Sequence, residues 1–435
     1  MKKNNLFASR LFYFFLHIVL FFYIYSIQFI GAPFGIGTRV FIGIIGFLIF
    51  FYDIIKIKND LIIKKSFLKL TVIFFSISII SFLTILYNKT TDFEFLFYYQ
   101  ASIIVIFFAS YLVIKLISLK TRDLDEVPVI FSLIINVVII QIIIALIMFS
   151  IQPVRDLLNS IQVTSDFELK VLEETLEFRL VGFGSKFFGS GIINGFTLII
   201  IGTILKLNHK INVFKYTICF LIIFVFGMMM ARTTIVGAIF ALAIILAPTN
   251  IFTFNVSRIK MNFKFLFYLI LIPLSIYIGI SLFFPEVNES LEFAFNFGFE
   301  IFINYFKADT IETESTNQLK EMFFWPSEFK TYLIGDGLFS DTINGGYYKG
   351  TDVGILRLIY YFGIFGLFAY LIFQLQVIYI AISTNRKYRV MFLVIFLYCI
   401  ALNFKGFTDI FFLVILFVFQ KPLNAKKQTP SYSHT

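Results

Sequence analysis

A few charged side chains stand alone at the edges of long apolar runs, and these are the residues best suited to chemistry. Arg232 separates two such runs, and Arg357 follows Asp352 by five residues at the start of another. An ionisable residue near membrane depth is costly, so it marks a candidate site. A guanidinium group can bind a phosphate through paired hydrogen bonds, and a carboxylate can accept a proton. We therefore assign Arg232, Arg357 and Asp352 as candidate catalytic residues.

Each of these residues also has an ordinary structural interpretation. Arg232 lies in a tight hairpin, so its guanidinium must point into protein, a lipid headgroup or a ligand, and binding to lipid phosphate competes with binding to a substrate phosphate. Asp352 precedes a predicted helix, where an acid meets the positive end of the helix dipole. Both alternatives stay open from the sequence.

A second group of residues is suited to holding a ligand. Arg179 and Lys186 flank a glycine-rich entry to a predicted helix, and Lys405 lies between two short apolar runs. Glycine permits tight turns and close backbone approach, and a nearby acid can bind a sugar hydroxyl. The substrate-binding candidates are therefore Arg179, Lys186, Gly335, Asp336, Gly337 and Lys405. An ordinary turn and a positive helix flank explain the same patterns.

Histidine and metal-binding patterns give no competing site. The three histidines are His17, His209 and His434, and none lies in a predicted outer segment. No His, Cys or acid cluster has metal-ligand spacing, and no phosphate-binding loop of the GxxxxGK[ST] kind occurs. We expect neither a metal nor a cofactor.

The elements that must position these residues are membrane-spanning helices. The chain is 59% hydrophobic and 14% charged, a ratio that a soluble domain does not reach. A span needs about 20 apolar residues, and in lipid the backbone must bond to itself, so the spans are helical. About twelve runs qualify by this pattern, all in one membrane domain, 1–435: Leu11–Thr38, Val40–Ile55, Leu70–Asn88, Phe95–Ile114, Val127–Val154, Phe187–Leu205, Tyr216–Ala231, Thr233–Ser257, Phe265–Pro285, Leu358–Asn385, Val390–Phe404 and Thr408–Gln420. The last two are short enough to form a hairpin or to cross only part of the membrane.

The charges predict the orientation of these spans. With the N-terminus inside, the inner segments hold 23 basic residues and 5 acids, whereas the outer segments hold 13 basic residues and 21 acids. Short basic loops belong in the cytoplasm. Both termini are then cytoplasmic, and the net charge of +10 reports topology rather than binding to nucleic acid. Two long outer loops follow, 150–186 and 285–351, the second between helices nine and ten, and Glu286–Phe306 within it is typical of an amphipathic interfacial helix.

The pattern Gly335-x-Gly337, Thr351-Asp352-Val353-Gly354, Arg357 and the Tyr361–Gly366 segment, after lone arginines at two outer positions, resembles the Wzy-type O-antigen and capsule repeat-unit polymerases. The resemblance implies a GT-C-like glycosyltransferase in the bacterial plasma (inner) membrane. Such an enzyme transfers a growing glycan from undecaprenyl pyrophosphate to a new lipid-linked repeat unit, without a metal and with inversion. It also implies that Arg179, Arg232 and Arg357 bind the pyrophosphate, and that a chain-length regulator and a flippase are partners.

Two alternatives remain from the residues. The related O-antigen ligases carry a histidine in the large outer loop, and residues 285–351 contain none, which favours a polymerase. A lipid-oligosaccharide flippase or another transporter also fits about twelve helices, but it has little need of the long outer loop.

Overall fold

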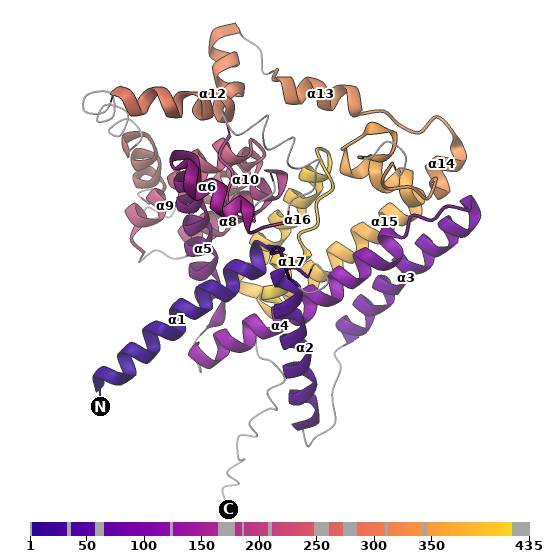
Figure 1. Ribbon diagram of the computed structural model, residues 1–435, viewed down its shortest axis with the longest axis horizontal. Coiled ribbons are helices and arrows are strands. Elements are labelled where there is room, and N and C mark those ends of the chain that lie inside the picture. The colour runs from indigo at the N-terminus through magenta and orange to yellow at the C-terminus, as the bar shows by residue number, and fades with distance from the viewer. Residues whose placement is uncertain are drawn as a thin grey trace, which may run out of the picture.

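The computed structural model describes residues 2–32, 36–56, 65–121, 125–163, 179–184, 187–207, 211–247, 261–272, 285–308, 312–341 and 346–419. All regular secondary structure in these ranges is helical, and the other backbone pairings are three isolated β-bridges. The predicted all-α class is confirmed (Figure 1). Lys186, parts of the predicted loops 150–186 and 285–351, and parts of four predicted spans lie outside the described ranges.

Seven of the described helices are long and apolar enough to cross a membrane. Their apolar character follows from the charge-free runs of the sequence, which leave few polar side chains to face lipid. They are α2 (Thr38–Lys56), α3 (Lys65–Asn88), the π-helix η2 (Glu94–Tyr98) continuing into α4 (Tyr99–Thr121), α5 (Glu126–Ser150), α8 (Phe187–Leu207), α9 (Val213–Met230) and α15 (Gly354–Thr384).

Four further apolar helices are shorter within the described residues. They are α1 (Lys2–Ile24), whose apolar part is Arg10–Ile24, α10 (Thr234–Leu246), the helix Met261–Ile272, and α16 (Arg389–Asn403). The predicted spans Thr233–Ser257 and Phe265–Pro285 continue beyond α10 and beyond Ile272 into residues that are not described. A multi-pass membrane protein is therefore supported by seven helices, fewer than the twelve expected from the sequence.

The last predicted span, Thr408–Gln420, is a broken helix buried in protein. It consists of α17 (Phe411–Val414) and the 3₁₀ turn η5 (Ile415–Phe417), and no side chain from 410 to 418 except Phe412 is more than 5% exposed. The Asn385 side chain, at the end of α15, donates a 2.7 Å hydrogen bond to the Phe417 carbonyl. Irregular backbone at membrane depth is tolerated where protein surrounds it and supplies such partners.

The centre of the bundle is α8, in which most side chains are buried. It packs closely on α10, because a Cβ added to Gly237 would lie 2.1 Å from the Cα of Gly195. Glycine at both positions allows the two backbones to touch, as is common between membrane helices. This close packing fixes the ends of α8 and α10, which flank the candidate site.

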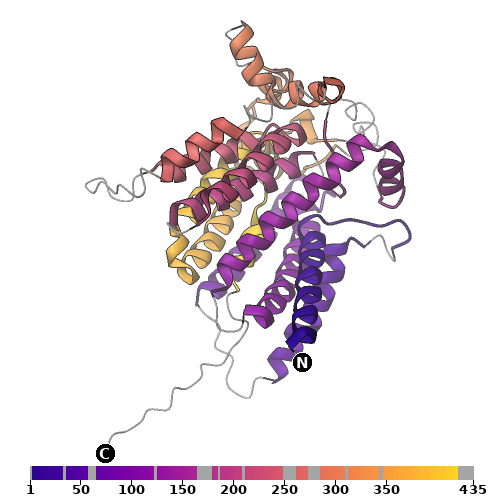
Figure 2. The ribbon, with the colours of Figure 1, turned by 90° about the vertical axis from the view of Figure 1, so that its left-hand side faces the viewer.

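The candidate residues lie at one end of the bundle, which we call the loop end. It carries 88–94, 179–184, 230–234, 297–308, 312–341, 346–357 and 405–406, the last packed against Gly354. Here α12 (Pro285–Ala308), α13 (Glu314–Met322), α14 (Phe329–Ile334) and the 3₁₀ turn η3 (Tyr348–Gly350) cover the spanning helices, with α6 (Gln152–Ser160) nearby. Figure 2 shows α12 and α13 at the opposite end of the molecule from the start of α1. The predicted helix Glu286–Phe306 is confirmed as α12.

Candidate functional site

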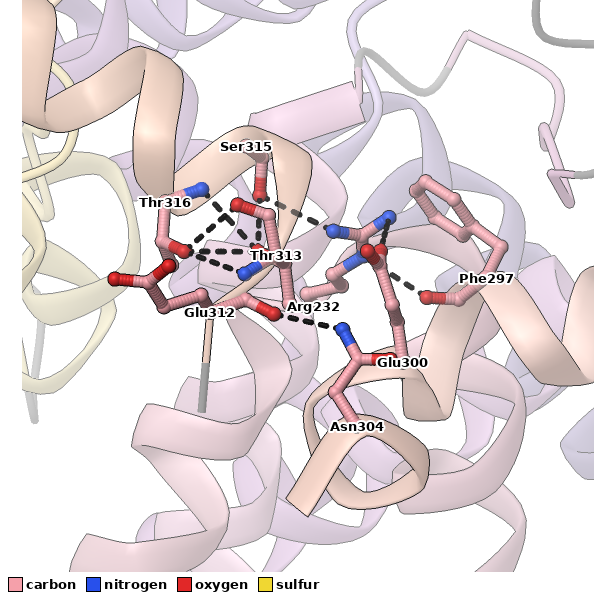
Figure 3. A network of polar contacts seen from close by, with 8 residues as sticks. All are labelled: Arg232, Phe297, Glu300, Asn304, Glu312, Thr313, Ser315 and Thr316. Carbon is pink, nitrogen blue, oxygen red and sulfur yellow. Dashed lines mark hydrogen bonds and ion pairs between the residues drawn. The ribbon is translucent and has the colours of Figure 1, made fainter. Parts of the chain in front are cut away.

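Arg232 is the hub of a polar network that joins the α9–α10 hairpin to the helices above it (Figure 3). Its Nε donates a 2.9 Å hydrogen bond to the Phe297 carbonyl, and a terminal nitrogen donates a 3.2 Å bond to Ser315. The other terminal nitrogen forms an ion pair with Glu300 at 2.6 Å. Phe297 also places its ring 4.2 Å from the guanidinium carbon. Arg232 therefore holds α12 and α13 onto the bundle.

This network answers the question of where Arg232 points. The hairpin leaves only three residues between α9 and α10, and its arginine is directed into protein, with 11% of its side chain exposed. The partner that the sequence did not reveal is Glu300, which the amphipathic pattern of α12 showed only as one acid among several. Because the two residues are 68 positions apart, no local signal could have paired them.

Arg179 lies next to Arg232. Its Nε donates a 2.6 Å hydrogen bond to the Met230 carbonyl, and its guanidinium lies over the rings of Phe187, at 4.3 Å, and Phe297, at 5.3 Å. Both arginines thus share the Phe297 ring. Burial and the charge of Arg232 lower the pKa of Arg179. Two like charges are held together here with aromatic rings between and beside them.

Lys405 adds a third cation from a different part of the chain. It follows α16 and is half-buried, and burial together with the charges of Arg179 and Arg232 lowers the pKa of Lys405 to about 8. Asp352 acts in the opposite direction. We call Arg179, Arg232 and Lys405 the cation cluster. Among the described residues, Glu300 is its one directly ion-paired carboxylate.

Arg357 lies in the first turn of α15 and is 8% exposed. Its guanidinium is enclosed by the rings of Phe339, at 3.7 Å, and Tyr347, at 4.0 Å. One terminal nitrogen reaches the Phe339 carbonyl at 3.5 Å, and the buried Nε has no hydrogen-bond partner. A buried donor without a partner costs roughly 1–3 kcal/mol, so this guanidinium is held ready for an acceptor that the described residues do not supply.

Asp352 interacts electrostatically both with Arg357 and with Lys405 of the cation cluster. It does not cap α15 with its side chain: the cap residue is Val353, whose N–H donates a 3.3 Å hydrogen bond to Thr351 Oγ1. Asp352 nevertheless lies just before the helix start, so its interaction with the positive end of the helix dipole stays a prediction. Burial raises the pKa of Asp352, and the positive charges of Arg357 and Lys405 oppose that rise. The Asp352 carboxylate thus interacts with two cations, Arg357 of α15 and Lys405 of the cation cluster.

The Gly335–Gly337 turn has a structural role that its sequence does not reveal. The helix α15 is kinked at Gly363, where φ is 68° and ψ is −170°, a conformation that is essentially restricted to glycine. The kink leaves the carbonyls of Tyr360 and Tyr361 without helical donors. The N–H groups of Asp336 and Gly337 satisfy them at 2.7 Å and 2.9 Å. The turn is thus docked onto the break in α15.

The rest of this turn is also engaged. Side chains from the end of α3 and the following loop donate to its carbonyls: Thr84 to Ile334, Asn88 to Gly335 and Thr90 to Gly337, at 3.1, 3.0 and 2.9 Å. Nothing in the local sequence pairs segments about 250 residues apart.

The Asp336 carboxylate accepts hydrogen bonds from Thr331, at 2.7 Å, and Tyr348, at 3.2 Å. Gly335, Asp336 and Gly337 are therefore engaged in holding the segment 312–341 against α3 and α15.

The loop before α4 brings two acids toward Arg357 that the sequence did not single out. Asp92 accepts backbone hydrogen bonds from Phe339, at 2.7 Å, and Ser340, at 3.2 Å, and so fixes the ring that lies on Arg357. Glu94 begins the π-helix η2. Both acids interact electrostatically with Arg357.

Comparison with known proteins gives no relative: no family model, no curated protein and no solved structure matches this chain. The geometry of the loop end is therefore the basis of the functional assignment. It brings together Arg179, Arg232, Lys405, Asp352 and Arg357, and it assigns Gly335, Asp336 and Gly337 to packing, while Lys186 lies outside the described residues.

Proposed function

We propose that this protein polymerises undecaprenyl-pyrophosphate-linked oligosaccharide repeat units into O-antigen or capsular polysaccharide. The supporting observation is the cation cluster, in which Arg179, Arg232 and Lys405 come from three segments and interact electrostatically, and in which Glu300 is the carboxylate that the described residues place in an ion pair with Arg232. Keeping like charges half-buried lowers stability, so their retention favours a polyanionic ligand that neutralises them. A pyrophosphate attached to a lipid has that charge and would reach the ends of membrane helices.

The role of each residue follows from which of its polar atoms already have a hydrogen-bond partner in the protein. The terminal nitrogens of Arg179 and the ammonium of Lys405 have no hydrogen-bond partner among the described residues, so they can bind phosphate oxygens. Arg232 adds charge while it anchors α12. Stabilising the charge on the departing pyrophosphate contributes most to such a reaction. Asp352 interacts electrostatically with both Lys405 and Arg357, and the sugar next to the pyrophosphate would be placed between these two cations.

The reaction is a displacement at the anomeric carbon of the growing glycan. A hydroxyl oxygen of the incoming repeat unit forms the new bond, the bond from carbon to pyrophosphate oxygen breaks, and the hydroxyl proton passes to a carboxylate. The finer features belong to the same proposal: a GT-C-like arrangement of about twelve spans, cytoplasmic termini, and a loop end on the outer face of the plasma membrane. The long outer segment that covers the cluster favours an enzyme over a flippase.

Reconstitution tests this proposal. The full chain in liposomes is supplied with purified lipid-linked repeat units, and the products are separated by length. We expect a ladder of longer glycans, and we expect Arg179→Gln and Arg357→Gln to reduce it by roughly 100-fold or more. Glu312→Gln, an exposed change on the same loop layer, is the matched control and should keep the ladder. Transbilayer movement of the lipid without elongation would refute the proposal and identify a flippase.

A further inference from the structure

Glu94 stands out among the carboxylates near Arg357 because its oxygens are unoccupied. Asp92 accepts backbone N–H groups, Asp336 accepts two hydroxyl groups, and Asp352 accepts a hydrogen bond from Tyr347. The half-buried Glu94 carboxylate receives no hydrogen bond or ion pair from any described residue, although Asp92 fixes its backbone N–H at 3.1 Å. A residue held this firmly by its backbone, with an open side chain, is suited to receive a ligand.

An independent observation points to the same place. Arg357 is more than nine-tenths buried, and its Nε has no partner. Its electrostatic partners are Glu94 and Asp92 from the loop before α4, and Asp352 and Tyr347 from the loop before α15. Phe95, next to Glu94, lies 5.2 Å from the Phe339 ring that covers the Arg357 guanidinium. The open carboxylate and the open guanidinium donor therefore belong to two segments that pack against each other, and their charges interact.

The backbone at Glu94 supports this reading. The segment Glu94–Tyr98 is a π-helix, a rare element that occurs frequently at functional sites. It places Glu94 at the start of the α4 span, while burying Phe95 among Phe339, Tyr361 and Phe362. The wide turn thus anchors Phe95 in the core, while Glu94 stays half-buried.

We propose that Glu94 binds the reacting hydroxyl of the acceptor saccharide and takes its proton. This inference rests on the proposed polymerase function. As the hydroxyl oxygen forms its bond to the anomeric carbon and the pyrophosphate leaves with the electron pair of the broken bond, the proton moves to a Glu94 oxygen and from there to water. A proton acceptor needs an oxygen within hydrogen-bond reach of the hydroxyl, and Glu94 is the acid near Arg357 that has both oxygens open.

The test compares Glu94→Gln and Glu94→Asp with the wild-type chain in the liposome assay. General-base catalysis typically contributes 10²–10⁴-fold, so Glu94→Gln should lower kcat by about 100-fold or more, with KM for the lipid-linked donor changed less than about threefold. Glu94→Asp keeps a carboxylate and should recover at least about tenfold of that loss. Glu312→Gln is the control, because it makes the same chemical change at an exposed acid.

Binding of farnesyl pyrophosphate to each purified protein separates a chemical role from a structural one. Because Glu94 does not hold the pyrophosphate, Glu94→Gln should bind this probe as tightly as the wild type does. If the variant polymerises at near wild-type rate, or if it loses probe binding together with the ladder, the role of Glu94 is refuted while the polymerase stands. If the wild-type chain binds the probe but produces no ladder, the polymerase function fails, and the role of Glu94 fails with it.

Discussion

The ion pair between Arg232 and Glu300 allows a quantitative prediction about how α12 is held. The substitution Glu300→Gln keeps the volume of the side chain but removes its charge. The pair is short, 2.6 Å, with side-chain exposures of 11% for Arg232 and 27% for Glu300. Exposed pairs contribute about 0–1 kcal/mol, whereas breaking a buried pair costs roughly 3–5 kcal/mol.

We expect a value between these limits because Arg232 keeps two other acceptors. After the substitution it still donates to the Phe297 carbonyl and to Ser315, so its charge is not left without partners. The docking of α12 should weaken by about 2 kcal/mol, which corresponds to about a 30-fold change in the opening equilibrium. The relevant quantity is local opening, since a multi-span protein does not unfold in one two-state step.

Hydrogen exchange in nanodiscs, read by mass spectrometry, measures this opening. Peptides covering 297–308 should exchange about 30-fold faster in Glu300→Gln. The control is Glu312→Gln, which breaks a pair of equal length, 2.6 Å, whose side chains are 64% and 55% exposed; it should change exchange less than about threefold. Equal effects of the two substitutions, or no effect of Glu300→Gln, would show that burial of the Arg232 pair does not hold α12.

Three further predictions concern the pH response, the kink and the orientation. Because the pKa of Lys405 is about 8, affinity for farnesyl pyrophosphate should fall about tenfold from pH 7 to 9 as the ammonium loses its proton. The variant Lys405→Arg stays charged and should abolish this decline. A decline of the same size in the variant would exclude Lys405 as the group whose titration lowers the affinity. The effect of pH on folding stability has the opposite sign. Because the pKa of Lys405 is lower in the folded state than in the unfolded state, the unfolded state binds more protons above pH 8. The contribution of Lys405 to the free energy of unfolding therefore increases as the pH rises above 8. Gly363→Ala places a Cβ 2.0 Å from the Leu333 carbonyl oxygen at a φ of 68°. The Gly335–Gly337 turn should then undock, and tryptic cleavage at Lys330 should accelerate by at least about tenfold. Cleavage at the wild-type rate would contradict the docking of the turn on α15. In a cysteine-free background, a cysteine at Glu312 should react with an impermeant reagent in intact cells and one at Lys56 only after permeabilisation, and labelling of both from outside would refute the topology.

Hydrophobicity and charge predicted the elements of the fold well, because they depend on local composition. Most runs without charge became helices, and the acidic apolar segment 286–306 became α12, but the run Leu11–Thr38 is helical only as far as Ile24. The ends were less accurate where tertiary packing decides the structure. The segment 408–420 looked like a short span, yet it is a broken helix whose free backbone groups are satisfied by Asn385 and Tyr370 from α15. The sequence of the segment 408–420 does not indicate which distant side chains will bond to its backbone.

The site was predictable in part, and for a physical reason. Lone arginines at the ends of apolar runs can be recognised in the sequence, because the free-energy cost of placing a charge near the membrane depends on the neighbouring residues of the same run. Their partners are not visible, because Glu300 and Glu94 are ordinary acids until the fold brings them to Arg232 and Arg357. The Gly335–Gly337 turn shows the converse, since a pattern suited to ligand binding serves to satisfy the broken backbone of α15.

That turn nevertheless bears on function through Arg357. The kink at Gly363 separates the first turns of α15 from its long lower part, and those first turns carry Arg357. They are bonded to the Gly335–Gly337 turn through the N–H groups of Asp336 and Gly337, and the residues after the turn place the Phe339 ring against the guanidinium. The start of α15 and this turn therefore form one unit that positions Arg357. A substitution in the turn should impair catalysis without touching the ligand, so loss of activity at Gly335 would not identify a binding residue, whereas loss at Glu94 with the probe still bound would identify a chemical one.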